Sequence, residues 1–443
     1  MGCPRCKVSW KFLVPYTKRV PRLITMFSLI IAGEMIFGLP FHTARFFRPT
    51  FLEVFGFTNT QAGDLFALYG VTAMIAYFPG GALADRYPAR TLLTASLFAT
   101  AAGGFYMATI PAAVNMAFLY AFWGVTTIFL FWGALIRATR EWGGQSSQGV
   151  AFGVLEGGRG LAAALVSTLA LAVFAAIMPE NVGLASDDVR RAGMQSIIFV
   201  YSFAALGAGI LAWLTVPVPD PISYKRSNPL HGMVVVLRRP VIWAQAAIII
   251  CAYCGYKGLD NYSLYAVQVL GMDEVRGAAL STYGAWVRPF GAVIAGLVAD
   301  RFNAARTIGV AFVVLIMSYC LLGVSASDAA ALNIIYANLF VSFFAVFSLR
   351  GIYFALLEEN RTPAYLTGAA VGFVSLVGYT PEVFFAPIAG RILDANPGLV
   401  GFQHYFLFLA GIAAAGVVVV GWLLWLRRTG EEHLWPVKPA ILK

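Results

Sequence analysis

Charged residues are scarce in this sequence of 443 residues. Asp, Glu, Lys and Arg together make up 12% of the chain, whereas 60% of its residues are hydrophobic. A soluble globular protein carries about 25% charged residues, because its surface must face water. The low charge and the mean hydropathy of +0.76 therefore exclude a soluble globule and indicate a membrane protein.

Motifs for catalysis and cofactor binding are also missing. We find no Gly-rich phosphate loop, nucleophile elbow or His-Glu metal motif at an interpretable spacing. We therefore predict neither an enzyme nor a cofactor. The five cysteines offer no extracellular disulfide framework, and Cys3 and Cys6 lack the nearby ligand pair that a structural metal site needs. The N-terminus shows no removable signal peptide.

Long apolar segments are abundant. A helix needs about 20 apolar residues to cross the hydrocarbon core of a bilayer, which is about 30 Å thick. Such segments lie near residues 22–47, 61–84, 91–111, 113–137, 147–178, 193–217, 241–270, 277–299, 306–324, 329–356, 363–391 and 402–426. They are far longer than the strands of a membrane barrel and lack their alternation. We predict an all-α membrane protein with twelve transmembrane helices.

The distribution of Lys and Arg predicts the orientation. If both termini are cytoplasmic, 21 of the 31 Lys and Arg residues lie on the cytoplasmic side and six on the outer side. This bias is typical of plasma (inner) membrane proteins. The same bias explains the net charge of +10, because the excess Lys and Arg residues face the anionic inner leaflet of the membrane. We therefore expect no nucleic-acid partner. Residues 219–240, where hydropathy falls, are predicted to form a cytoplasmic linker.

A short motif occurs twice, each time at the end of an apolar segment. In both copies a Gly precedes an Asp-Arg pair by four residues, and a further Arg follows. The residues are Gly81, Asp85, Arg86 and Arg90 in the first copy, and Gly296, Asp300, Arg301 and Arg306 in the second. The motif resembles the loop between the second and third helices of the major facilitator superfamily. Members usually have a Gly and a basic residue after the Asp-Arg step, where this chain has Pro88 and Ala89, or Asn303 and Ala304.

The resemblance implies a secondary transporter built from two pseudo-symmetric six-helix bundles that rock about a central site. The expected units are an N-terminal bundle at residues 1–218, the linker at 219–240 and a C-terminal bundle at 241–443. In such a protein the repeated motif forms a cytoplasmic gate. Asp85 and Asp300 would then pair with an arginine or cap a neighbouring helix, and so hold the outward-facing state closed on the inside.

Charged residues inside the apolar segments are candidates for function, because a charge at the centre of the bilayer costs several kcal/mol unless it is paired or hydrated. Glu34 lies 12 residues after Arg22, or about 18 Å along a helix, and it needs a proton or a partner from another helix. Glu156 with Arg159, and Lys257 with Asp260, are each three residues apart and can form ion pairs along one helix face.

Four cations are expected within the membrane: Arg159, Lys257, Arg288 and Arg350. Their excess favours an anionic substrate, because guanidinium groups bind carboxylate and phosphate through two hydrogen bonds. For Arg350 the alternative is that its side chain reaches the cytoplasmic interface. Transporters of the organophosphate and organic-anion branch hold anions on helices one, five and seven, which carry Arg45, Arg159 and Lys257 here. We expect Arg45 nearer the outer end, in a vestibule or at the interface.

The sequence thus predicts a secondary transporter for a small solute, an organic anion, with Arg159, Lys257, Arg288 and Arg350 binding the substrate. Proton symport would use Glu34, Glu156 or Asp260, because a carboxyl group in an apolar environment binds a proton more readily.

Three alternatives remain. One is a metabolite or drug exporter of the same superfamily, although the fifth helix lacks the Pro-bearing signature of drug antiporters. Another is a metal-ion transporter that uses His42, Cys251, Cys254, Asp260 and Glu34, although no metal site is predicted. The third is a transporter-like receptor or scaffold without transport, which an appended signalling domain would suggest, and we find no such domain in the sequence. The expected partners are the solute and the lipid bilayer, and we expect a monomer.

Overall fold

The chain is helical in nearly every part that the structure describes. The computed structural model describes residues 21–144, 148–218, 234–325, 332–363 and 366–429. Twelve long helical stretches cover the twelve apolar segments, so the predicted all-α fold is confirmed. Among the described residues, nine helices are both long and apolar enough to cross a membrane. The other three predicted spans form helices α4, α5 and α13.

The elements of the first half, residues 22–215, are α1 (Arg22–Met35), the π-helix η2 (Gly38–His42), α2 (Thr43–Phe46), α3 (Arg48–Phe55), α4 (Asn59–Arg86), α5 (Ala89–Met107), α6 (Ala113–Val125), the π-helix η3 (Thr126–Trp132), α7 (Gly133–Gly143), α8 (Gln148–Ile177), the 3₁₀ turn η4 (Val182–Leu184) and α9 (Asp187–Thr215). The first and fourth spans are therefore each interrupted by a π-helix. Such bulges are often found at functional sites.

The elements of the second half, residues 240–428, are α11 (Pro240–Gly258), the 3₁₀ turn η6 (Leu259–Asn261), α12 (Tyr262–Gln268), α13 (Glu274–Phe302), α14 (Ala304–Val324), α15 (Leu332–Ile352), the 3₁₀ turn η8 (Tyr353–Ala355), α16 (Leu356–Glu359), α17 (Thr367–Gly378), α18 (Pro381–Ala395) and α19 (Leu399–Arg428). The seventh span breaks at η6, which contains Asp260.

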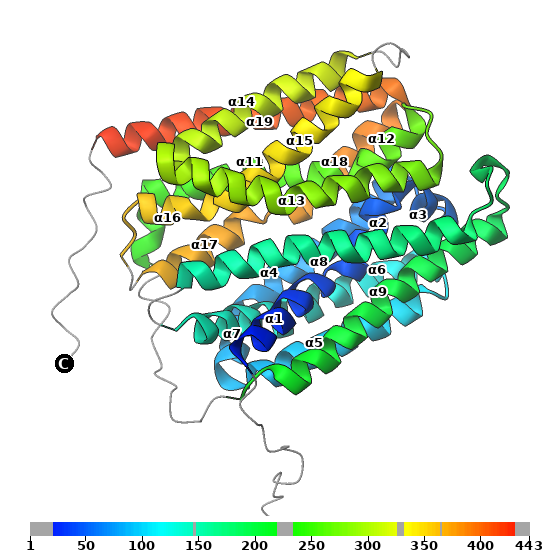
Figure 1. Cartoon of the computed structure of the whole chain (residues 1–443). Coiled ribbons are helices and arrows are strands. Elements are labelled where there is room, and N and C mark those ends of the chain that lie inside the picture. Colours follow the sequence, from blue (N-terminus) through cyan, green and yellow to red (C-terminus); the bar gives the residue numbers. More distant parts are fainter. Residues whose placement is uncertain (1–20, 145–147, 219–233, 326–331, 364–365, 430–443) are drawn as a thin grey trace, which may run out of the picture.

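The two halves lie side by side as two bundles of six long helical stretches. In Figure 1 the helices coloured blue to green occupy the lower part of the view, and most of those coloured light green to red the upper part. Helices α8 and α13 run beside each other where the halves meet. The predicted boundary at the linker stays a prediction, because residues 219–233 lie outside the described residues.

Local sequence explains where several helices begin. Thr58 accepts a hydrogen bond from the backbone N–H of Gln61 (3.1 Å), whose side chain accepts one in return from Thr58 (3.0 Å). This reciprocal pair satisfies two otherwise unbonded N–H groups at the start of α4. Asp273 caps α13 in a similar way through the N–H of Arg276 at 2.8 Å.

The halves approach most closely along α4 and α18. A Cβ atom added at Gly70 would lie 2.6 Å from the carbonyl carbon of Glu382, so only glycine permits this distance between the two backbones. Gly63 and Gly390 face the partner backbone in the same way. At the end where α4 begins, the Asp394 carboxylate accepts hydrogen bonds from the N–H groups of Asn59 and Thr60 at 3.1 and 2.7 Å. A residue of α18 therefore caps the start of α4 and closes this end of the molecule.

Candidate functional site

The first group of buried charges surrounds Glu34 of α1. One carboxylate oxygen of Glu34 accepts a hydrogen bond from Arg288 Nη1 of α13 (2.7 Å), and the other accepts one from Arg159 Nε of α8 (3.0 Å). Arg159 Nη1 also donates to Glu156 at 2.5 Å, and Arg288 Nη2 lies 3.7 Å from the same carboxylate. We call Glu34, Glu156, Arg159 and Arg288 the Glu34 cluster. It joins both halves, because Arg288 belongs to the second half and the other three residues to the first.

Two glycines make room for the arginines of the Glu34 cluster. A Cβ at Gly33 would lie 3.3 Å from Arg159 Cδ, and one at Gly160 would lie 3.1 Å from Arg288 Cγ. The sequence suggests instead that Gly153 and Gly157 support close helix contact, because they are four residues apart. That expectation is wrong, since nothing lies within 4 Å of a Cβ at either position.

The second group of buried charges surrounds Asp260 of η6. Its carboxylate accepts a hydrogen bond from Arg45 Nε of α2, and its second oxygen lies 3.1 Å from Lys257 Nζ. Lys257 Nζ is also 3.1 Å from Glu382 of α18, which in turn accepts a hydrogen bond from the Tyr253 hydroxyl. We call Arg45, Lys257, Asp260 and Glu382 the Asp260 cluster. The expected place of Arg45, in an outer vestibule or at the interface, is wrong: its side chain is buried in an ion pair between the halves.

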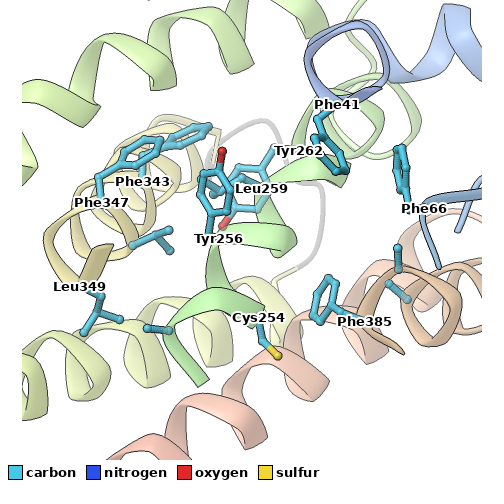
Figure 2. Packing of buried hydrophobic residues seen from close by; sticks show 14 of the residues in the cluster. Phe41, Phe66, Cys254, Tyr256, Leu259, Tyr262, Phe343, Phe347, Leu349 and Phe385 are labelled. Carbon is cyan, nitrogen blue, oxygen red and sulfur yellow. The ribbon is translucent and has the colours of Figure 1, made fainter. Parts of the chain in front are cut away.

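Aromatic rings surround the charged groups. Lys257 Nζ lies 4.3 Å from the ring centroid of Phe41 and 5.0 Å from that of Phe66, so the ammonium gains a cation–π contribution from the first half. Figure 2 shows Tyr256 between these phenylalanines and the rings of Phe343 and Phe347. The network is therefore enclosed by apolar surface, which strengthens each electrostatic contact.

Arg350 of α15 differs from the four cations of the two clusters. Its guanidinium carbon lies 3.9 Å from the centroid of the Tyr256 ring and 6.0 Å from that of Tyr253. Its Nε and Nη1 are buried and have no hydrogen-bond partner among the described residues. The alternative in which this side chain extends to the interface is therefore wrong. Arg45 lies 4.2 Å from the same Tyr256 ring and donates to its hydroxyl at 2.5 Å, so Tyr256 connects Arg350 with the Asp260 cluster.

The residues of the repeated motif lie at the ends of α4 and α13, away from both clusters. Arg90 is buried and donates through Nε to the carbonyl of Val216 (2.5 Å). Gly81 faces open space, and Arg86, Asp300, Arg301 and Arg306 are exposed, with Gly296 partly so. The side chain of Asp85 lies outside the described residues. The gate therefore stays a prediction.

Nothing among the described residues forms a group of three or more His, Cys, Asp and Glu side chains arranged to hold a metal ion. Cys254 is buried, Cys251 is partly buried, and both belong to α11. The metal-ion alternative therefore gains no support from the geometry.

Sequence reasoning brought out seven of the eight residues of the two clusters and missed Glu382, which holds Lys257. A signal was available, because Glu382 is a carboxylate within the apolar segment 363–391. The three-residue spacings did predict the ion pairs of Glu156 with Arg159 and of Lys257 with Asp260, at 2.5 and 3.1 Å.

A sequence profile of the Major Facilitator Superfamily matches residues 23–386. The chain belongs to the major facilitator superfamily. Membership makes it an integral membrane protein that moves a small solute by secondary transport, and it agrees with the two-bundle fold.

Relatives and solved structures agree with the family. The Escherichia coli (strain K12) inner membrane proteins YqcE and YihN are each 26% identical, over 90% and 89% of this chain and 93% of theirs. The Thermus thermophilus protein named "Probable nitrate/nitrite antiporter NarK1" is 25% identical over 66% of this chain and 63% of its own. In structure, the chain resembles the nucleoside transporter NupG, with a TM-score of 0.66 at 11% identity over 92% and 98% of the two chains. A bacterial homologue of the human lysosomal transporter Spinster, inward-facing and occupied, gives 0.65 at 14% over 95% and 98%.

Proposed function

We propose that this member of the superfamily is a secondary transporter of a small organic anion in the inner membrane, acting as a monomer by alternating access. The single observation that carries the proposal is the unpaired charge of Arg350. The two clusters and Arg350 together contain five cations (Arg45, Arg159, Lys257, Arg288 and Arg350) and four carboxylates (Glu34, Glu156, Asp260 and Glu382). Five minus four leaves one positive charge.

An uncompensated charge in a low-dielectric interior costs several kcal/mol, and an anionic solute would remove that cost. Arg350 suits this role because two of its nitrogens are buried without a hydrogen-bond partner in the described chain. Arg159, Arg288 and Lys257 are held by carboxylates in this structure. We infer that Arg350 makes the first contact with the solute, and that the other three bind it after exchange with their carboxylates.

Exchange of this kind links binding to conformation. Glu34 joins Arg159 of its own half to Arg288 of the other half. A solute anion that takes the place of Glu34 on Arg288 would loosen one connection between the halves and form another. This is the differential interaction with two conformations that alternating access requires. The name of the Thermus relative, which refers to nitrate and nitrite, also favours an anionic solute.

Proton symport is part of the proposal. Of the three carboxylates that the sequence suggested, Glu34 and Asp260 are buried and each is held by two cations. The Glu156 side chain is 46% exposed, so it can exchange protons with water. We propose that protons reach the site through Glu156, and that Glu34 and Asp260 act as counterions.

Ligand binding to purified full-length protein tests the anion proposal. Nitrate, acetate, lactate and inorganic phosphate are titrated while the melting temperature is followed, with choline and glucose as cationic and neutral controls. At least one anion should raise the melting temperature, because binding to the folded state alone stabilises it, and neither control should.

The change Arg350→Gln should weaken the binding of that anion by about tenfold or more, because a charge-assisted contact contributes about 1.5–3 kcal/mol. The matched control is Arg276→Gln, since Arg276 is 78% exposed at the start of α13. Binding by Arg350→Gln that equals the wild type would overturn the assignment of Arg350. A response to choline alone would overturn the anion proposal.

A further inference from the structure

A small cavity lies between the halves and touches both clusters. Its volume is about 20 Å³, and its walls include Arg288 of the Glu34 cluster, Arg45 of the Asp260 cluster, and His42, Tyr256 and Ser281. The remaining walls are buried apolar side chains, among them Leu259. A space of this size holds about one water molecule, or one atom of a larger ligand that extends from it.

Three residues of the cavity wall each carry a buried polar atom without a hydrogen-bond partner among the described residues: His42 (Nδ1), Ser281 (Oγ) and Arg288 (Nη2, which lies 3.7 Å from the Glu156 carboxylate). Buried polar groups are nearly always bonded, because leaving one unsatisfied costs free energy. A serine hydroxyl and an arginine N–H can both donate, and Arg45 adds positive charge to the same wall. These features suit a negatively charged group that accepts hydrogen bonds.

The position of His42 makes it responsive to such a group. Its Nε2 lies 3.5 Å from Glu34 Oε1, and a nitrogen that faces a carboxylate carries its hydrogen. In the neutral ring, Nδ1 is then an acceptor and would repel an anion. In the protonated ring, Nδ1 becomes a third donor toward the cavity.

The charged groups around His42 set the condition for its protonation. Glu34 of α1, whose Oε1 lies 3.5 Å from Nε2, favours a charged ring, whereas the guanidinium groups of Arg45 of α2 and Arg288 of α13 on the cavity wall, and of Arg159 of α8 on Glu34, disfavour it. The other titratable groups nearby are the hydroxyls of Tyr201 of α9, whose ring centroid lies 5.8 Å from that of His42, and of Tyr256 of α11, on the cavity wall. An anion in the cavity would add negative charge beside the ring and so favour the imidazolium.

The backbone presents His42 to the cavity through the π-helix η2, which ends at this residue. The wider turn contains Pro40 and follows α1, and it leaves the His42 ring within 3.5 Å of the Glu34 carboxylate as well as on the cavity wall. Since π-bulges are frequent at functional sites, this break is an independent reason to place function at His42.

We propose that the cavity receives one oxygen atom of the negatively charged group of the solute, and that His42 takes up the accompanying proton on Nδ1. This proposal rests on the proposed function and adds the residue that carries the coupled proton. The proton comes from water through Glu156 and converts the imidazole into an imidazolium, and no covalent bond other than N–H is made or broken. By linkage, the anion and the proton each strengthen the binding of the other.

The test uses purified full-length protein with acetate, nitrate and chloride, all of which are predominantly monoanions between pH 5.5 and 7.5. Affinities are obtained from melting-temperature titrations at both pH values, and proton uptake is followed with a pH-sensitive dye in weakly buffered solution. In the wild type we expect acetate or nitrate to bind at least about fivefold more tightly at pH 5.5, with proton uptake on binding at pH 7.5.

Two variants and a control complete the test. His42→Gln keeps a donor toward Glu34 but cannot be protonated, so its affinity should be equal at both pH values and no proton should be taken up. Ser281→Ala should bind more weakly at both pH values and keep the pH dependence. The matched control is Thr282→Ala, which removes a neighbouring buried hydroxyl that is also unpartnered but does not line the cavity, and it should behave as the wild type does.

Several outcomes would overturn the proposal. Retained pH dependence in His42→Gln would remove His42 from the mechanism, while anion binding that depends on Arg350 would leave the proposed function intact. If chloride alone binds through His42, the occupant is a free inorganic ion and not a group of the solute. If acetate and nitrate leave the wild type unchanged at both pH values, the cavity does not bind an anionic group.

Discussion

At the scale of single residues, Glu34 determines which arginines are available. It bonds to Arg159 and Arg288, and it would compete with an anionic solute for both. The change Glu34→Gln should strengthen anion binding by about tenfold, because freed guanidinium groups form charge-assisted bonds. Uptake into proteoliposomes should become slower, because no carboxylate of this helix helps to release the anion.

The comparison variant is Glu274→Gln, which removes a carboxylate from an ion pair with Arg190 at the start of α13 and should change neither quantity. Melting temperatures must show that both variants are folded. Weaker anion binding by Glu34→Gln would contradict competition between the carboxylate and the solute.

The pair of Arg45 and Asp260 gives a second prediction at this scale. Removing one partner of a buried ion pair costs about 3–5 kcal/mol, because the other charge remains uncompensated. Asp260→Asn should therefore lower the melting temperature of the protein, and adding Arg45→Gln should restore part of the loss. Lys257 keeps Glu382 as its partner in both variants. An additive effect of the two changes in a double-mutant cycle would show that the pair does not stabilise this conformation.

Local residue contacts could be predicted from the sequence, and distant ones could not. Spacing along one helix was enough for Glu156 with Arg159, because residues three apart share a helix face. Glu34 and Arg288 are 254 positions apart, so their contact depends on how the two halves pack. The exposure of Arg350 could not be predicted either, because its distance from the helix end allowed both a buried and an interfacial position.

At the scale of elements, the approach of α4 to α18 closes one end of the molecule. Gly70→Val should prevent this approach, because a Cβ at this position would meet the backbone of α18 at 2.6 Å. We expect the population to shift toward a state that is open at the end where α4 begins. Labelling of a single cysteine introduced at Asp64, which belongs to α4 and pairs with Arg391 of α18 at 2.9 Å, should become faster.

Gly411→Val in α19 is the matched control, because nothing lies within 4 Å of a Cβ there. Equal labelling rates in the two variants would show that the close approach of α4 and α18 does not control access from this end.

Hydropathy predicted all twelve helical stretches, since a membrane-spanning helix is defined by its length and apolar character. It did not predict the π-helices η2 and η3 or the break at η6, because these interruptions leave the apolar character of a segment unchanged. The short helix α3 was also missed, since at eight residues it is too short for a span. Two of these features, η2 and η6, contain His42 and Asp260, so the site depends on irregular backbone that composition does not reveal.

At the scale of the whole molecule, the halves are connected by buried ion pairs from each cluster, Glu34 with Arg288 and Arg45 with Asp260. Both must be rearranged if the halves rock, and a solute that replaces carboxylates on the arginines makes this rearrangement possible. The family and the twelve-helix fold follow from the repeated motif and the hydropathy. The class of solute follows from the balance of buried charge, which requires the partners of each charge to be known.

The most direct test of the central claim is the uptake of a radiolabelled anion into proteoliposomes that contain the full-length protein. The anion is the one that raises the melting temperature most. We predict that the wild type accumulates it in response to an inward proton gradient, that other small anions compete and choline does not, and that Arg350→Gln loses uptake whereas Arg276→Gln retains it. Transport of a cation or a neutral solute in place of the anion, or uptake by Arg350→Gln at the wild-type rate, would contradict the claim.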